Sequence, residues 1–259
     1  MQEDLKIALI QSSLAWENAT QNRKNFTEKI NSIDEDVDVI VLPEMFTTGF
    51  TMNANGNKET MQGETVQWLL DMASKKDVAI TGSIIVEEEG AFYNRLLFVE
   101  PNGVISTYDK KHTFTLAGEH KVYKAGDKKL IVDYKGWSIC PLVCYDLRFP
   151  VWARNTEDYD LLIYVANWPK VRVDAWSTLL KARAIENMSY CIGVNRVGLD
   201  GNNYEYSGHS AAYDVLGNRL DNIEVGKEQI EVITLSKSHI KTYRDKLQFL
   251  EDRDSFSLK

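Results

Sequence analysis

The first 76 residues alternate between two patterns of hydrophobic and polar positions. Short runs of β-branched and other apolar residues, typical of buried strands, are each followed by a longer segment in which apolar residues recur at wider, helical spacing. The runs at 5–11 and 36–44 predict strands, and the segments at 18–33 and 64–76 predict helices. Asn and Thr at the start of the first helical segment offer helix caps. A strand–helix unit is therefore expected to occur twice.

From Val78 onward the pattern is richer in strands. Turn signals at Glu-Gly and Pro-Asn-Gly divide 78–110 into segments typical of antiparallel hairpins, so the sheet should be mixed. The pattern then predicts a strand at 160–168, a helix at 174–189, a strand at 190–198, a hairpin at 210–223, a strand at 230–236 and a short C-terminal helix. No linker, low-complexity tract or repeat interrupts the chain, and residues 1–259 are expected to form a single α/β domain.

Composition and charge narrow the choice of partner. The chain of 259 residues is 44% hydrophobic, enough for a sizeable core, and its net charge of -8 is spread without a basic stripe. Binding to a nucleic-acid backbone needs such a stripe, so a small-molecule partner is favoured. No apolar run is long enough for a signal peptide or a membrane span, and the cytoplasm is the expected compartment.

Three cysteines, an odd number, do not suggest a disulfide framework, and a reducing compartment would keep them as thiols. Cys140 and Cys144 lie four residues apart, without a CxxC pair or a nearby histidine cluster, so no metal site is predicted. Cys140 shares a strand face with Cys144 but should lie about 13 Å deeper at about 3.3 Å per residue, which indicates a core residue. Cys191 is interpreted as core as well.

Three reactive side chains fall at predicted strand ends, where ligands of α/β sheets commonly bind. Glu44 ends "VIVLPE", Lys110 ends "VISTYDK" and Cys144 ends "WSICPLVC". Taken singly, each has an ordinary interpretation as a solvated acid, a surface cation and a buried small hydrophobe. Together, an acid, a cation and a thiol are the groups that covalent catalysis at an acyl carbon needs.

Four segments, in this order, resemble the motifs of the nitrilase superfamily of carbon–nitrogen hydrolases, especially its bacterial omega-amidase branch: "LPEMFTTGF", "YDKKHTF", "CYDLRFPVWARN" and "ANWP…AWSTLLKARAIENMSYCIGVNRVG". The resemblance covers nearly the whole chain. It implies a four-layer α–β–β–α sandwich with mixed sheets. It also implies that Glu44 is the general base, Lys110 the oxyanion-stabilising cation and Cys144 the nucleophile, with Glu119 of "AGEH" as a second acid. Glu119 could equally be a solvated acid beside His120.

The same resemblance implies hydrolysis of 2-oxoglutaramate, or of the monoamide of 2-oxosuccinate, to the 2-oxo acid and ammonia without a cofactor. The backbone N–H of Tyr145 would complete the oxyanion hole. A homodimer or larger even assembly is also expected, because the C-terminal tail carries Leu and Phe side chains without an obvious place in a monomer. Thr113 and Val151 stand where many relatives have Leu and Glu, and neither position carries the chemistry.

Local expectations follow for the residues around the nucleophile. Cys144 should stand at a sharp turn from a strand into a helix, where the helix N-terminus favours a thiolate. Asp146 and Arg148 are expected to cap that helix and to form a buried ion pair. Trp168 is expected either to wall the pocket or to fill the core. Arg172, on the loop after the next strand, could hold a substrate carboxylate, or could instead be solvated or pair with Asp174.

Other functions fit parts of the sequence. Within the superfamily, a deaminated-glutathione amidase or an N-carbamoyl amino acid hydrolase would need a longer or ureido-accepting pocket. Outside it, a Cys–His thiol hydrolase or transferase could use His120 or His209 as its base, but the Glu and Lys at strand ends would then have no role. A non-catalytic binding module of the same fold would not need Glu44, Lys110 and Cys144 together.

Overall fold

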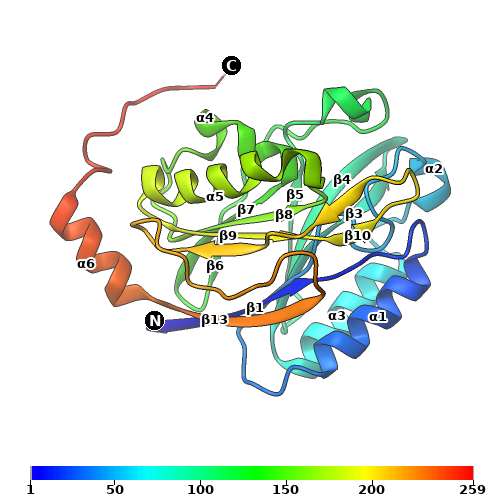
Figure 1. The fold of residues 1–259 in the computed structure, drawn as a ribbon, viewed down its shortest axis with the longest axis horizontal. Coiled ribbons are helices and arrows are strands. Elements are labelled where there is room, and N and C mark those ends of the chain that lie inside the picture. Colours follow the sequence, from blue (N-terminus) through cyan, green and yellow to red (C-terminus); the bar gives the residue numbers. More distant parts are fainter. Residues whose placement is uncertain (1, 259) are drawn as a thin grey trace.

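Two β-sheets lie face to face between two layers of helices in the computed structural model, which describes residues 2–258 (Figure 1). The larger sheet has the order β13-β1-β2-β3-β4-β5. Its strands are β1 (Asp4–Gln11), β2 (Val39–Val41), β3 (Ala79–Glu88), β4 (Ala91–Val99), β5 (Ile105–Asp109) and β13 (Gln229–Ser236). β1 is parallel to β2 and antiparallel to β13, and β3 to β5 form antiparallel pairs. The prediction of a mixed sheet is therefore confirmed.

The second sheet has the order β12-β9-β8-β7-β6. Its strands are β6 (Val132–Tyr134), β7 (Trp137–Val143), β8 (Leu161–Ala166), β9 (Tyr190–Asn195) and β12 (Ala211–Tyr213), and a separate pair consists of β10 (Val197–Leu199) and β11 (Glu205–Ser207). β7, β8 and β9 run parallel. The three central strands are buried along nearly their whole length, which explains why their sequences are continuous apolar runs.

Helices cover the two outer faces. α1 (Ala19–Asn31) and α3 (Glu64–Lys76) lie side by side on the larger sheet, and α5 (Val173–Asn187) lies on the second sheet (Figure 1). β1 alternates between two cores: Ile7 and Leu9 face the second sheet, while Ala8 and Ile10 face α1 and α3. The four-layer α–β–β–α order is thereby confirmed.

The remaining helices are α2 (Ala54–Asn57), α4 (Pro150–Ala153), α6 (Lys237–Leu247) and the 3₁₀ helices η1 (Thr115–Ala117), η2 (Glu119–Lys121), η3 (Cys144–Arg148) and η4 (Lys170–Arg172). Asn18 caps α1 by accepting a hydrogen bond from the Gln21 N–H at 3.0 Å, as its position predicted. α3 has the predicted bounds, and α6 is the expected C-terminal helix. Within residues 2–258, no helix combines the length and apolarity needed to cross a bilayer.

Three predictions about strands need correction. The predicted strand at 36–44 is regular only in β2, so that Glu44 lies in the loop beyond it. The segment at 190–198 divides into β9 and β10, because the chain leaves the second sheet after Asn195. The hairpin at 210–223 contributes only β12 as a strand, and its second arm returns through a single bridge between Tyr213 and Arg219.

Candidate active site

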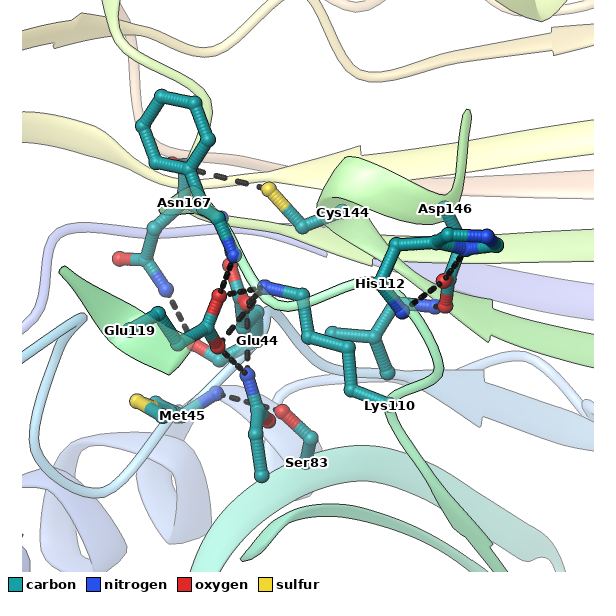
Figure 2. Close-up of polar contacts among 12 residues, drawn as sticks. Glu44, Met45, Ser83, Lys110, His112, Glu119, Cys144, Asp146 and Asn167 are labelled. Carbon is teal, nitrogen blue, oxygen red and sulfur yellow. Dashed lines mark hydrogen bonds and ion pairs between the residues drawn. The ribbon is translucent and has the colours of Figure 1, made fainter. Parts of the chain in front are cut away.

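A buried ion cluster joins the predicted acids and the predicted lysine. The Lys110 ammonium lies 2.9 Å from Oε1 of Glu44 and 2.9 Å from Oε2 of Glu119 (Figure 2). All three side chains are almost completely inaccessible to solvent. Burial opposes the charge on Lys110, but the two carboxylates outweigh it, and the pKa of Lys110 lies well above its ordinary value. The solvated alternative for Glu119 is thus wrong, because this acid pairs with Lys110.

Backbone geometry presents the reactive groups to one another. Lys110 follows β5 directly, and its N–H donates to the Asn94 carbonyl at 3.0 Å. Cys144 follows β7 and begins η3 with a φ of 44°, a left-handed conformation that is uncommon outside glycine. Met45 has a φ of 42°, which turns the chain sharply after Glu44. Strained residues of this kind are frequent at functional sites.

Two asparagines that were not singled out in the sequence orient Glu44. Asn94 on β4 donates to Glu44 Oε1 at 2.8 Å, and the Asn167 N–H donates to Oε2 at 2.8 Å. The Asn167 side chain also donates to the Glu44 carbonyl. Asn94 offered one signal in the sequence, since asparagine is depleted within strands. Asn167 follows β8 and could have been selected by the strand-end criterion that selected Cys144.

The thiol of Cys144 lies beside this cluster and is 9% exposed. Its Sγ lies 4.0 Å from the Asn167 carbonyl, which accepts a long hydrogen bond from the thiol (Figure 2). Burial and the charge of Glu44 raise the pKa of Cys144 well above its ordinary value, against the opposing effect of Lys110. The expectation of a thiolate favoured by a helix N-terminus is therefore wrong. The helix is only a five-residue 3₁₀ turn, and the raised pKa favours the thiol form.

A cavity of about 640 Å³ opens onto Cys144 and Lys110. Its walls are rich in aromatic side chains, namely Trp16, Phe50, Phe114, Tyr145, Trp168, Tyr204 and Tyr206. The Phe50 ring lies 5.2 Å from the Lys110 ammonium. Trp168 serves both of its predicted purposes, because it lines the cavity and is also buried in the core. Cys140 and Cys191 are completely buried, which confirms their interpretation as core residues.

Two arginines also line the cavity. The Arg172 guanidinium stacks 5.1 Å from the Phe114 ring, and that of Arg148 lies 4.9 Å from the Trp168 ring. Neither forms an ion pair with a carboxylate in the part of the chain that the structure describes. Within that part, the alternative in which Arg172 pairs with Asp174 is excluded, and the expected pair of Arg148 with Asp146 is wrong. Arg148 is exposed, whereas Asp146 is buried and bonded elsewhere.

None of the four histidines, all of which are among the described residues, lines this cavity. His120 is exposed, His209 lies 3.1 Å from the Ser207 hydroxyl, and His112 Nδ1 lies 2.7 Å from Asp146. A Cys–His pair therefore has no geometric support. Across residues 2–258, no group of three or more His, Cys, Asp or Glu side chains is arranged to hold a metal ion.

Residues 6–245 match the model of the carbon-nitrogen hydrolase family. The chain belongs to this family. An omega-amidase (YafV) of Yersinia enterocolitica is 46% identical, with 98% of each chain covered, and a 2-oxoglutaramate amidase of Bacillus subtilis is 34% identical over 86% of this chain and 87% of its own. The crystal structure of a CN-hydrolase superfamily protein from Xanthomonas campestris superimposes with a TM-score of 0.96 at 42% identity and covers all of both chains.

Membership of the carbon–nitrogen hydrolase family identifies the protein as an amide-hydrolysing enzyme. The nitrilase-superfamily sandwich expected from the motifs is confirmed by the structural similarity to the Xanthomonas protein, which carries an arsenic adduct in its own active site. The structure of yeast Nit3, a member of branch 10 of the nitrilase superfamily, has a TM-score of 0.85 at 23% identity and covers 95% of each chain. At that identity it supports the fold alone.

Proposed function

We propose that this carbon–nitrogen hydrolase hydrolyses the terminal carboxamide of a small 2-oxo acid, 2-oxoglutaramate or 2-oxosuccinamate, to the 2-oxo acid and ammonia. The observation that carries the proposal is the Glu44–Lys110–Glu119 cluster beside the Cys144 thiol, at a cavity that is also lined by two guanidinium groups without a carboxylate partner within residues 2–258. The similarity to an omega-amidase and to a 2-oxoglutaramate amidase supports the same substrate class. The reaction needs no cofactor.

Acylation begins with attack of Cys144 Sγ on the carboxamide carbon. Because burial and Glu44 raise the pKa of the Cys144 thiol, Glu44 takes its proton as the C–S bond forms. The oxyanion is stabilised by the Lys110 ammonium and by the Tyr145 backbone N–H. One such donor commonly lowers the activation free energy by roughly 3 kcal/mol. Glu44 then passes its proton to the nitrogen as the C–N bond breaks. Ammonia leaves, and a thioester remains on Cys144.

In deacylation, water takes the place of the thiol as the nucleophile. Glu44 removes a proton from a water molecule, whose oxygen attacks the thioester carbon. The second tetrahedral intermediate is stabilised by the same two donors. The C–S bond then breaks, Glu44 returns the proton to the departing sulfur, and the 2-oxo acid is released. The sum of both halves is amide plus water to acid plus ammonia.

Glu119 has a positioning role in this scheme. Both of its oxygens accept hydrogen bonds from Lys110, at 3.0 and 2.9 Å, and Oε2 also accepts one from the Phe114 N–H. Burial raises the pKa of Glu119, while Lys110 opposes that effect. We propose that Glu119 keeps the ammonium directed toward the oxyanion.

The proposed substrate carries a carboxylate at the end opposite its amide, and a cation must meet that charge. Arg172 and Arg148 both line the cavity and have no ion-pair partner among the described residues. The two guanidinium groups lie over the Phe114 and Trp168 rings, and a planar guanidinium can bind a carboxylate through two parallel hydrogen bonds. Arg172 is proposed as the principal contact and Arg148 as a second one.

Ammonia release across a panel of amides tests the proposal: 2-oxoglutaramate, 2-oxosuccinamate, deaminated glutathione, N-carbamoyl amino acids and an uncharged amide of similar length. The 2-oxo acid monoamides should give the highest kcat/KM. A higher kcat/KM for deaminated glutathione or an N-carbamoyl amino acid would assign the enzyme to another branch of the family.

Arg172→Met tests the proposed carboxylate contact. It should raise KM for 2-oxoglutaramate strongly and spare the uncharged amide. Lys170→Met is the matched control, because Lys170 pairs with Glu205 and lies outside the cavity lining. Equal losses on both substrates would mean that Arg172 serves structure and that the carboxylate is bound elsewhere.

We propose the cytoplasm as the compartment, because all three cysteines are free thiols.

A further inference from the structure

The catalytic candidates come from two different sheets. Glu44 and Lys110 follow β2 and β5 of the six-stranded sheet, whereas Cys144 follows β7 of the five-stranded sheet. The distance between the ammonium and the carbon attacked by sulfur therefore depends on how the two sheets are held together at this edge. Apolar packing between sheets fixes their separation but tolerates small sliding, whereas hydrogen bonds fix direction.

We infer that Asp146 is a positioning residue, which holds Lys110 and Cys144 in register by binding both strand ends with one carboxylate. This inference rests on the proposed thioester mechanism and adds a residue to it. Asp146 is completely buried within η3 and does not line the cavity. It therefore acts through its neighbours and does not contact the substrate.

Four hydrogen bonds converge on this carboxylate. On the six-stranded side, Oδ2 accepts from the Tyr108 hydroxyl at 2.8 Å, and Oδ1 accepts from the His112 N–H at 3.0 Å and lies 2.7 Å from His112 Nδ1. On the five-stranded side, Oδ2 accepts from the Val143 N–H at 3.1 Å. Tyr108 and His112 flank Lys110 on either side, and Val143 directly precedes Cys144. Figure 2 shows Asp146 and His112 next to Cys144 and Lys110.

The partners of Asp146 are themselves fixed. Trp152 donates its indole N–H to the Tyr108 hydroxyl at 3.0 Å, so that oxygen has both an acceptor and a donor. The His112 ring stacks on the Phe149 ring, with centroids 3.6 Å apart and planes 4° from parallel. The hydrogen bonds of Asp146 are thus part of a larger buried network. Such networks hold geometry well because every polar group in them would be costly to leave unpaired.

Asp146→Asn keeps the size of the side chain but replaces one acceptor oxygen with an NH₂ group. At least one N–H or O–H donor then loses its acceptor, and the two strand ends are no longer held by one group. A displacement of about 1 Å at a reacting centre can cost about 10²-fold in rate. Asp146 does not line the cavity that would bind the substrate, so KM should change little.

The test compares Asp146→Asn with Asp160→Asn. Asp160 is a buried aspartate at the other end of β7, where it accepts from the Ser138 N–H at 2.9 Å. Both variants should lose thermal stability. At a temperature well below both melting points, only Asp146→Asn should lose kcat, by about 10²-fold with nearly unchanged KM. An unchanged kcat, an equal kcat loss in Asp160→Asn, or a rise in KM in place of the kcat loss would overturn the inference.

Tyr108→Phe provides a second variant in case Asp146→Asn does not fold. It removes the hydroxyl that donates to Asp146 and should lower kcat about tenfold with KM nearly unchanged. Wild-type kcat in Tyr108→Phe would contradict the positioning role. All variants are assayed with whichever amide of the panel the wild type hydrolyses fastest. A failure of 2-oxoglutaramate as substrate therefore stays separate from a failure of the Asp146 inference.

Discussion

Asn167 binds Glu44 at two points: its backbone N–H donates to the carboxylate at 2.8 Å, and its side chain donates to the Glu44 carbonyl at 2.5 Å. The two residues follow strands of different sheets. The proposed base is thus oriented from the sheet that carries the proposed nucleophile. Together with the Asp146 network, this pair makes the geometry of the site depend on contact between sheets.

Lys110→Met should lower kcat by about 10²- to 10³-fold while KM changes far less. The reason is that the ammonium meets an oxyanion that develops only near the transition state. Steady-state ammonia release measures both constants. Lys111→Met is the neighbouring control and should keep wild-type kcat, because the Lys111 ammonium lies over the Trp152 ring outside the cavity lining. Near-normal turnover in Lys110→Met would remove Lys110 from the mechanism.

Glu44→Gln should prevent formation of the thioester, since the raised pKa of Cys144 favours the thiol and the amide cannot accept the thiol proton. Mass spectrometry of the variant quenched during turnover should find no acylated Cys144 peptide. An acyl-enzyme that accumulates in Glu44→Gln would instead restrict Glu44 to the deacylation half of the reaction.

The pH dependence of alkylation tests the protonation state of Cys144. Burial and Glu44 raise its pKa, so the thiolate fraction grows only as the pH passes beyond the ordinary thiol value of about 8.5. The rate of modification by iodoacetamide, read on the Cys144 peptide, should therefore still be rising at about pH 9. A rate that is already level at about pH 7 would indicate a preformed thiolate, as in a Cys–His pair. Cys144→Ala provides the unlabelled control.

The C-terminal tail leads to a prediction about assembly. Leu250 packs against the core and Arg253 donates to the Asn155 carbonyl at 3.1 Å, and only the segment after Arg253 extends from the body of the molecule (Figure 1). Phe256 and Leu258 in this segment are 44% and 54% exposed. The tail extends to Lys259, which lies outside the described residues. Exposed apolar side chains of this kind favour burial against a second copy. Light scattering should give a homodimer or a larger even assembly, and removal of 254–259 should weaken it. A monomer mass at micromolar concentration would contradict the prediction.

The sequence predicted those parts of the fold that depend on local pattern. α3 was correct to the residue because its apolar positions recur at helical spacing. The buried central strands were found because both of their faces are covered. Glu44 was placed at the end of a longer strand, since the apolar run continues beyond β2 into the loop and apolar residues in a loop and in a buried strand look alike in sequence.

The sequence could not predict contacts between segments that are far apart in the chain. Asp146 was expected to pair with its near neighbour Arg148, but its partners Tyr108 and His112 come from β5 of the other sheet and from the loop after it. For the same reason, the raised pKa of Cys144 was missed: it depends on burial and on a carboxylate from the other sheet. The Glu44–Lys110 proximity was expected because both residues fall at predicted strand ends and because the motifs resemble a family in which these residues act together.

The central claim is that Cys144 is the nucleophile in hydrolysis of a 2-oxo acid monoamide. The most direct measurement is ammonia release from 2-oxoglutaramate by the wild type, Cys144→Ala and Cys140→Ala, with thermal melts to establish that each protein is folded. The account predicts turnover by the wild type and Cys140→Ala and none by a folded Cys144→Ala, because one small side chain at the cavity is lost. Turnover by Cys144→Ala together with its loss in Cys140→Ala would contradict the claim.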